Sequence, residues 1–187
     1  MYKYCKTDQS AQRQRDLEQG LLAMMEHKCF EEISVSDLCE RLNIPRKSFY
    51  RYFSSKEGAL FALLDHTLME FYETGTLDGL RGGTAAEDLE RLFRFWKSHR
   101  NLLDAMLRSN LSGLLVDRAV SLAKREQLMP GYAKEWEEMV QDIAMSFAVC
   151  GIMSMVIQWH NDGYQISTEK MAQTAVAMLS RPLITSL

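Results

Sequence analysis

The chain has little of what interrupts helices or builds sheets. Its 187 residues include only three prolines and ten glycines, and no valine-rich run alternates apolar with polar positions. Apolar residues instead recur every three or four positions over long stretches, which is the period of a helix with one buried side. The composition, 47% hydrophobic and 25% charged, is typical of a soluble globular protein. The sequence therefore predicts an all-α protein.

Signatures of disulfide-bonded and membrane-spanning proteins are also missing. The four cysteines are widely spaced, form no CxxC pair and follow no secretory leader, so we expect reduced thiols and a cytoplasmic location. The most apolar run, residues 143–157, is about 15 residues long and falls short of the roughly 20 that span a bilayer. A buried helix explains this run better than a membrane anchor does.

Motifs that carry catalysis or bind metals are absent as well. The four histidines show no HExxH or other metal-binding spacing, and neither a glycine-rich phosphate loop nor a GxSxG turn occurs. We therefore expect no catalytic residues, no metal site and no cofactor, and a protein that is not an enzyme.

The strongest signal that the sequence does contain lies in residues 34–56. Ser34 precedes an expected helix over 35–41 and has Asp37 three positions on, so the two side chains can satisfy backbone N–H groups at the helix start. Asn43 stands where the chain must turn, because asparagine tolerates a left-handed conformation. These residues predict a short helix followed by a tight turn.

A second helix is expected over 46–52, after Pro45, whose missing N–H costs nothing at a helix start. Residues 41–56 contain five Lys or Arg and no Asp or Glu, although the whole chain has a net charge of −3. A helix-turn-helix with a basic second helix is suited to the DNA major groove. The side chains expected to face inward are Ile44, Ser48, Phe49, Tyr52 and Phe53. Those expected to face solvent or a groove are Arg46, Lys47, Tyr50 and Arg51.

Aromatic and basic residues close the second helix in the run Phe49-Tyr50-x-Tyr52-Phe53-x-x-Lys56-Glu57. With Cys29-Phe30 and the residues just described, this run makes residues 9–71 resemble the N-terminal domain of the TetR family of transcriptional regulators. A fainter similarity to that family's last two helices lies in Phe147-x3-Gly151-x7-Trp159 and in a helix start at Ser167.

The resemblance implies an all-α homodimer of about nine helices per chain. It implies an N-terminal three-helix helix-turn-helix DNA-binding domain, residues 1–54, and a C-terminal helical ligand-binding and dimerisation domain, residues 55–187. A regulator of this kind, in most cases a repressor, binds a palindromic operator and is released by a small molecule. The chain departs from the family's common pattern at three places. Asn43 stands where the family often has Gly, Pro45 where it often has Ser or Thr, and Lys47-Ser48 where it often has Gly-Thr.

The predicted contacts with double-stranded DNA form three sets. Those expected to hold the phosphate backbone are Ser34, Tyr50 and Lys56. Those expected to face base edges or nearby phosphates are Arg46, Lys47 and Ser48. Arg51 and Tyr52 are expected flanking contacts, although Tyr52 fits the core equally well.

The other helices are expected near residues 9–27, 56–73, 85–98, 100–108, 111–127, 133–161 and 168–180. A loop rich in Gly and Thr is expected from Glu73 to Thr84, and Pro130-Gly131 is expected to interrupt the helical structure. The helix over 56–73 joins the two expected domains and is the natural lever between them.

Dimerisation is expected through the helices near 133–161 and 168–180. Residues 143–157 carry no charge, and a helix that is apolar almost all round is buried in a core or in an interface. Small residues at Ala144, Ala148 and Gly151 would let another helix approach. The stripe expected to match them is Met171, Ala175, Met178 and Leu179.

An apolar effector of modest size is the expected ligand, since methionines are frequent beyond residue 65 and suit adaptable pockets. The residues expected to line its site are Trp96, His99, Leu103, Met106, Leu107, Leu114, Leu115, Phe147 and Cys150. The same stripes also fit an ordinary core. An alternative function is a helical homodimeric ligand-binding or scaffolding protein whose head contacts a protein partner instead of DNA.

Overall fold

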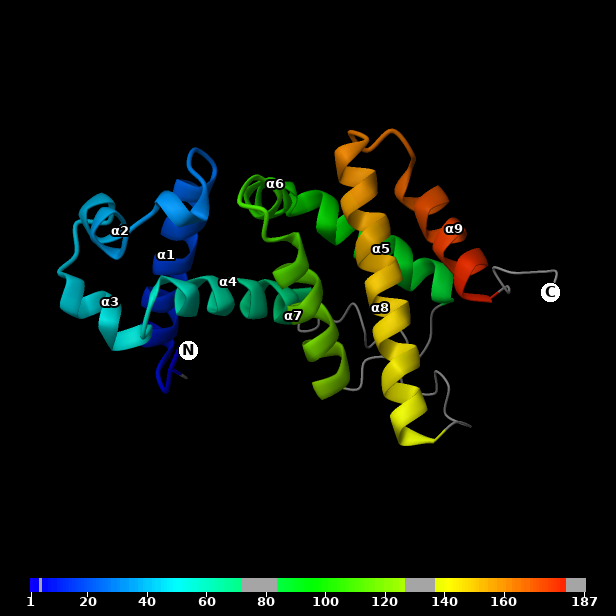
Figure 1. Cartoon of the computed structure of the whole chain (residues 1–187), viewed down its shortest axis with the longest axis horizontal. Helices are drawn as coiled ribbons and strands as arrows, with labels where there is room; N and C mark the ends of the chain where they lie inside the picture. Colours follow the sequence, from blue (N-terminus) through cyan, green and yellow to red (C-terminus); the bar gives the residue numbers. More distant parts are fainter. Residues whose placement is uncertain (4, 72–83, 127–136, 181–187) are drawn as a thin grey trace. The chain divides into compact units, whose positions relative to one another are not determined.

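The computed structural model of the chain describes residues 1–3, 5–71, 84–126 and 137–180 (Figure 1). Within these ranges the chain is helical, and the prediction of an all-α protein with an N-terminal helix-turn-helix is confirmed. The elements are α1 (Asp8–Met25), η1 (Phe30–Glu32, a 3-10 helix), α2 (Val35–Arg41), α3 (Arg46–Tyr52), α4 (Lys56–Phe71), α5 (Ala85–Ser98), α6 (Arg100–Arg108), α7 (Ser112–Arg125), α8 (Glu138–Asn161) and α9 (Thr168–Ser180).

The helix boundaries follow the sequence closely. Five helices, α2, α3, α5, α6 and α9, begin and end at the predicted residues. α1 ends at Met25, two residues early, because the N–H groups of His27 and Lys28 both bond to the carbonyl of Met24. The expected break at Pro130-Gly131 and most of the expected loop before α5 lie outside the described residues.

Contacts divide the chain into two compact units. The first contains residues 1–67 and 104–112, and the second contains residues 68–103 and 113–187. The expected domain boundary, between residues 54 and 55, separates the DNA-binding helices from the rest of the chain. The contacts instead place most of α4 in the same unit as the helix-turn-helix. The reason is that α4 contributes buried side chains such as Leu60, Leu63 and Leu64 to the core of the first unit.

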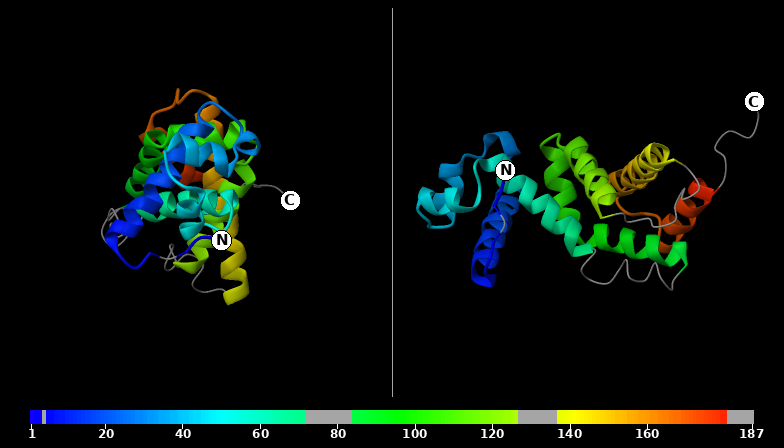
Figure 2. Two further views of the ribbon diagram at one scale, coloured as in Figure 1. Left: turned by 90° about the vertical axis from the view of Figure 1, so that its left-hand side faces the viewer. Right: turned by 90° about the horizontal axis from the view of Figure 1, so that it is seen from below.

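In the first unit, α2 packs against both α1 and α3, and the core contains aromatic and aliphatic side chains (Figure 2). Removing such large apolar side chains from water is the main source of stability in a unit of this size. The largest fully buried ones are Leu21, Met25, Ile33, Leu38, Phe49, Phe53, Leu60, Leu63 and Leu64.

The N-terminal segment packs on the start of α4. The Tyr2 hydroxyl donates to Asp65 Oδ2 at 2.7 Å, which satisfies a buried carboxylate. Gly58 permits the approach, because a Cβ at that position would lie 2.6 Å from the Met1 carbonyl oxygen.

In the second unit, α5 packs along α9, and both contact α8. Trp159 of α8 stacks edge-on against Phe93 of α5, with ring centroids 5.7 Å apart, and against Tyr164, at 4.7 Å. The turn after α8 places Gly163 and Tyr164 in the left-handed region, with φ of 68° and 59°. A tyrosine rarely adopts this conformation, and here its ring packing with Trp159 stabilises it.

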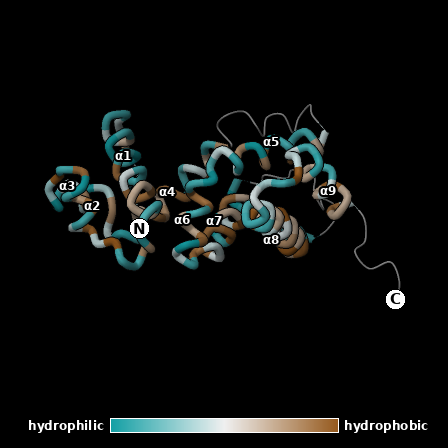
Figure 3. Tube along the Cα trace, turned by 90° about the horizontal axis from the view of Figure 1, so that it is seen from above, coloured by the Kyte–Doolittle hydropathy of each residue, from teal (hydrophilic) through white to brown (hydrophobic). Residues whose placement is uncertain are grey.

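α8 is the longest described helix and is apolar along most of its length (Figure 3). Among the described residues it alone has the length and mean hydropathy, 1.8, of a membrane span. Core helices of globular proteins reach the same values, and the side of α8 that carries Ala144, Ala148, Ile152 and Val156 is buried within the second unit.

The start of α2 shows the predicted reciprocal cap. The Asp37 N–H donates to Ser34 Oγ at 3.1 Å, and the Ser34 N–H donates to Asp37 Oδ2 at 2.9 Å. Hydrogen bonds from the Ser34 backbone and hydroxyl hold the pKa of Asp37 below its usual value. The charged carboxylate thus stabilises the first turn of α2 at neutral pH.

Replacement of this carboxylate gives a pH-dependent prediction. Because the pKa of Asp37 is lower in the folded than in the unfolded state, its carboxylate stabilises the fold above the ordinary carboxyl pKa of 3.8. This stabilisation is lost as the pH falls below that value. Asp37→Asn should therefore lower the free energy of unfolding at pH 7, and its difference from the unchanged protein should shrink towards pH 3. Urea unfolding at pH 7, 5 and 3 measures this, with Glu40→Gln on the same helix as the control. An Asp37→Asn effect that is equal at all three pH values would contradict the assignment.

Candidate nucleic-acid interface

α2 and α3 are joined by a tight turn. Asn43 adopts the predicted left-handed conformation, with φ of 51°, and the Ile44 N–H donates to the carbonyl of Cys39 at 2.9 Å. Pro45 is extended at the start of α3, and its carbonyl accepts a hydrogen bond from the Ser48 N–H at 2.8 Å. The backbone of the turn therefore fixes how α3 leaves α2.

Aromatic side chains anchor α3 to the first unit. Phe49 and Phe53 are fully buried, with ring centroids 5.2 Å apart, and Tyr52 packs beside Phe53 at 6.3 Å. The predicted inward orientation of these three is confirmed. Tyr52 is only 6% exposed, so of its two expected roles the structure supports the core and not a flanking DNA contact.

The opposite side of α3 is basic and open to solvent. Arg46, Lys47 and Arg51 are exposed, and Tyr50 is 45% exposed with its ring edge against Phe49. Because residues 41–56 include no Asp or Glu, no acidic side chain of this segment offsets the positive charge. α3 therefore presents a cationic, hydrogen-bonding surface of the kind that enters a DNA groove.

Ser34 and Ser48 border this surface. Ser34 is exposed at the start of α2, where its hydroxyl oxygen accepts the Asp37 N–H. Ser48 is half-buried in the first turn of α3. Both hydroxyls lie on the helix-turn-helix where the sequence predicts DNA contacts, and those contacts stay predictions.

Lys56 lies differently from the other basic residues. Its Nζ donates to the carbonyl oxygens of Phe30 at 2.6 Å, Glu31 at 3.1 Å and Ile33 at 2.8 Å. The same Nζ lies 4.5 Å from the centroid of the Phe30 ring. The ammonium group, which the sequence assigns to a phosphate, is bound to the backbone around η1.

A second cation binds the backbone just before η1. Arg108, at the end of α6, donates from Nη1 to the carbonyls of Met25, at 3.1 Å, and Glu26. Ser109 Oγ accepts the buried Phe30 N–H at 2.9 Å. The sequence predicts neither interaction, because residues about 80 positions apart leave no periodic pattern.

The residues expected to line the effector site are divided between the two units. Trp96 and Leu103 belong to the second unit, while Met106 and Leu107 belong to the first. Trp96, Leu103, Met106 and Leu115 are buried, as expected for either a pocket or a core. Phe147 and Cys150 are exposed, so the prediction that they line a cavity is wrong within a single chain. The cause is the rotation of α8, which turns its alanines inward and these residues outward.

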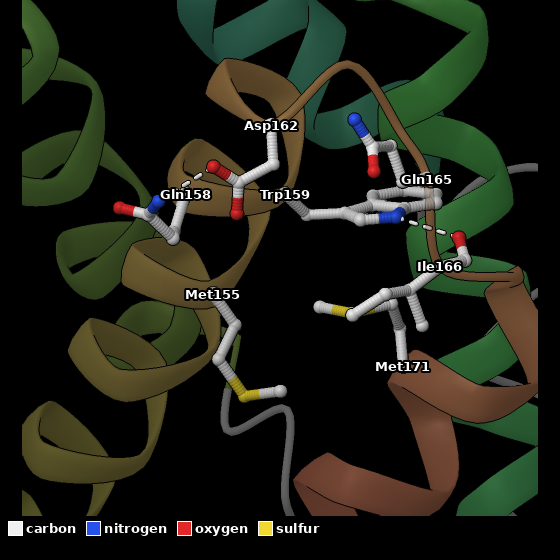
Figure 4. A pocket seen from close by; sticks show the side chains of 7 residues that line it. All are labelled: Met155, Gln158, Trp159, Asp162, Gln165, Ile166 and Met171. Carbon is white, nitrogen blue, oxygen red and sulfur yellow. Dashed lines mark hydrogen bonds between the residues drawn. The ribbon is translucent and has the colours of Figure 1, made fainter.

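A pocket that the sequence does not predict lies at the turn between α8 and α9 (Figure 4). Its volume is about 390 Å³, and the thioethers of Met155 and Met171 point into it. Gln158 Nε2 donates to Asp162 Oδ1 at 2.9 Å, and Trp159 Nε1 donates to the Ile166 carbonyl at 2.7 Å along its walls. None of its lining residues belongs to the expected effector set.

α8 also exposes an apolar side. Four large apolar side chains in its first half are solvent-exposed: Met139, Val140, Ile143 and Phe147. Met178 of α9 is half exposed as well. Of the three small residues expected to admit another helix, Ala144 and Ala148 pack inside the unit. Only Gly151 is open, since a Cβ at that position would have no neighbouring atom within 4 Å.

A capped, aromatically anchored helix-turn-helix with a basic exposed second helix, in an all-α chain, is the architecture of a class of DNA-binding transcriptional regulators. Similarity to known proteins specifies the family. Residues 20–63 match the pattern described as "Bacterial regulatory proteins, tetR family", and residues 83–181 match the pattern described as "Transcriptional regulator C-terminal region" of the same family. The chain belongs to the TetR family of transcriptional regulators.

Known proteins are similar to the chain in sequence or in fold. The HTH-type transcriptional regulator EthR of Mycolicibacterium smegmatis is 46% identical over 54 residues, which is 27% of this chain and 25% of the relative. The chain thus matches about a quarter of that curated relative's length. A TetR-family regulator from Syntrophomonas wolfei has a TM-score of 0.66 at 15% identity, over 95% of this chain and 99% of that one. The fatty acid degradation regulator FadR from Bacillus halodurans has a TM-score of 0.63 at 15% identity, over 96% and 98%.

Proposed function

We propose that the protein is a cytoplasmic repressor that binds a palindromic operator as a homodimer and is released by a small apolar molecule. The exposed basic side of α3 supports the DNA-binding step, because Arg46, Lys47 and Arg51 stand on a helix whose other side is fixed by buried aromatic rings. Base edges would be read by Arg46, Lys47 and Ser48. Ser34, Tyr50 and Arg51 would contact phosphates and set the register.

Selection from random duplex DNA at moderate salt tests this function. We expect a palindrome whose half-sites are about one helical turn, or a multiple of it, apart. Lys47→Ala should change the preferred base at particular positions and cost about 1–3 kcal/mol on the selected operator. Arg51→Ala, the matched change on the same helix, should weaken binding to all sequences alike. Equal losses on every sequence from both variants would contradict the division of roles.

The salt dependence of binding separates this function from a protein-binding head. Each phosphate neutralised releases counterions, so operator affinity should fall steeply as salt rises. A protein partner would show a shallower dependence, and no enriched DNA sequence would favour that alternative.

Homodimerisation through α8 and α9 is supported by the exposed apolar side of α8. A contiguous apolar surface of this kind is rare on a monomer, and a second copy related by a two-fold axis would bury it in a four-helix bundle. The pocket at the α8–α9 turn borders this side through Met155 and Gln158.

A charge placed on that side should separate the copies. Phe147 is 62% exposed, so Phe147→Glu should leave the fold of the single chain intact while burying an unpaired carboxylate in the dimer. Sedimentation or light scattering should detect a monomer, and operator affinity should fall because only one half-site is bound. Ser121→Glu on the exposed side of α7 is the control and should stay dimeric. A Phe147→Glu protein that is still a dimer would place the interface elsewhere.

The proposed effector rests on the predicted apolar residues, of which Trp96, Leu103 and Leu115 are buried. Heating the protein with a panel of hydrophobic compounds should find one that raises its melting temperature, since a ligand at 100 times its Kd contributes about 2.7 kcal/mol. The same compound should release DNA. Ile166→Trp, which narrows the pocket at the α8–α9 turn, should leave the stabilisation unchanged. A panel without any stabilising compound would count against an apolar effector.

A further inference from the structure

Lys56, the first residue of α4, uses its ammonium group on the protein's own backbone. An ammonium has three N–H donors, and three carbonyl oxygens, those of Phe30, Glu31 and Ile33, lie 2.6 to 3.1 Å from Nζ. Binding a phosphate would require at least one of these three hydrogen bonds to be given up.

The three carbonyls belong to the segment that leads into the helix-turn-helix. Glu31 lies within η1, Phe30 begins it, and Ile33 directly precedes Ser34, the capping residue of α2. The Phe30 carbonyl also accepts the Ile33 N–H at 3.2 Å, so Lys56 adds a second donor to it. By donating to all three carbonyls from α4, Lys56 ties the start of α4 to the start of α2.

Other contacts also hold Phe30, the first residue of this segment. The Phe30 side chain is buried with its ring 4.5 Å from Lys56 Nζ, and the Phe30 N–H donates to Ser109 Oγ. With its N–H, its carbonyl and its ring all engaged, Phe30 has a fixed place, and Lys56 accounts for two of the three interactions. A change at Lys56 therefore alters where α2 begins relative to α4.

We propose that Lys56 is a positioning residue for DNA recognition: its ammonium orients the helix-turn-helix by binding the backbone at residues 30–33, and it does not bind a phosphate. The inference rests on the proposed function, since it concerns how that operator is recognised. It separates Lys56 from Lys47, which is exposed on α3 and carries the same charge. Substitution of the two lysines should therefore change DNA binding in different ways.

The test compares Lys56→Met, which keeps the side-chain length and removes the ammonium, with Lys47→Met as the matched control. Lys56→Arg keeps a cation with several N–H donors and serves as the rescue variant. Affinities for the selected operator and for unrelated duplex DNA are measured over a range of salt concentrations, at a temperature where thermal unfolding shows every variant to be folded.

For Lys56→Met we expect an unchanged slope of log affinity against log salt. Its preference for the operator over unrelated DNA should fall at least about fivefold, the lower limit for one disturbed base pair. Lys56→Arg should recover part of this preference. Lys47→Met should instead change the preferred base at particular operator positions, as Lys47→Ala should. Arg51→Ala, which removes a proposed phosphate contact, should decrease the slope by about 0.9 for each phosphate that the protein no longer neutralises, twice per dimer. A decrease of that size in Lys56→Met, or an operator preference that stays unchanged, would overturn the proposal.

Hydrogen exchange of the free protein gives a readout that does not depend on DNA. In Lys56→Met the amides of residues 30–38 should exchange faster than in Lys47→Met, because the start of α2 has lost its anchor. Equal exchange in the two variants would overturn the proposal even if no operator were found. If the unchanged protein bound no DNA while this difference appeared, the proposed function would fail and the positioning of the helix-turn-helix by Lys56 would stand.

Discussion

The exposed basic side of α3 depends on the burial of Phe49 and Phe53. α2 and α3 have seven residues each, well below the roughly 12–15 at which an isolated helix becomes stable in water. They persist because their apolar sides pack into the first unit and because Ser34 and Asp37 cap α2. Burial of the two rings also sets the rotation of α3, and that rotation alone decides that Arg46, Lys47 and Arg51 face solvent.

Basic residues of the first unit occur in two kinds of surroundings. Those on the outer side of α3 keep their charge in solvent, where it can attract a polyanion. Lys56 and Arg108 instead donate to carbonyls at the end of α1 and around η1. A cation whose N–H groups donate to backbone carbonyls stabilises the fold and has fewer donors left for a phosphate, so counting lysines and arginines overstates the number of donors that DNA can meet.

α8 shows a similar division along one helix. Its alanines, with Ile152 and Val156, face the second unit, while Ile143 and Phe147 face solvent. This outward side is the surface on which we propose that a second copy packs. Such an interface would explain why α8 has apolar residues on both sides.

The sequence by itself determined the helices, the caps of α2, the left-handed turn at Asn43 and the inward and outward sides of α3. Each depends on residues within about one or two helical turns of one another, so the period and the capping residues record them directly. Only the tertiary structure decided that Lys56 and Arg108 bind backbone carbonyls, that Tyr52 is core, that Phe147 and Cys150 face outward, and that a pocket lies at the α8–α9 turn. These outcomes depend on contacts between distant segments and on the rotation of helices against their neighbours, which a local pattern does not specify.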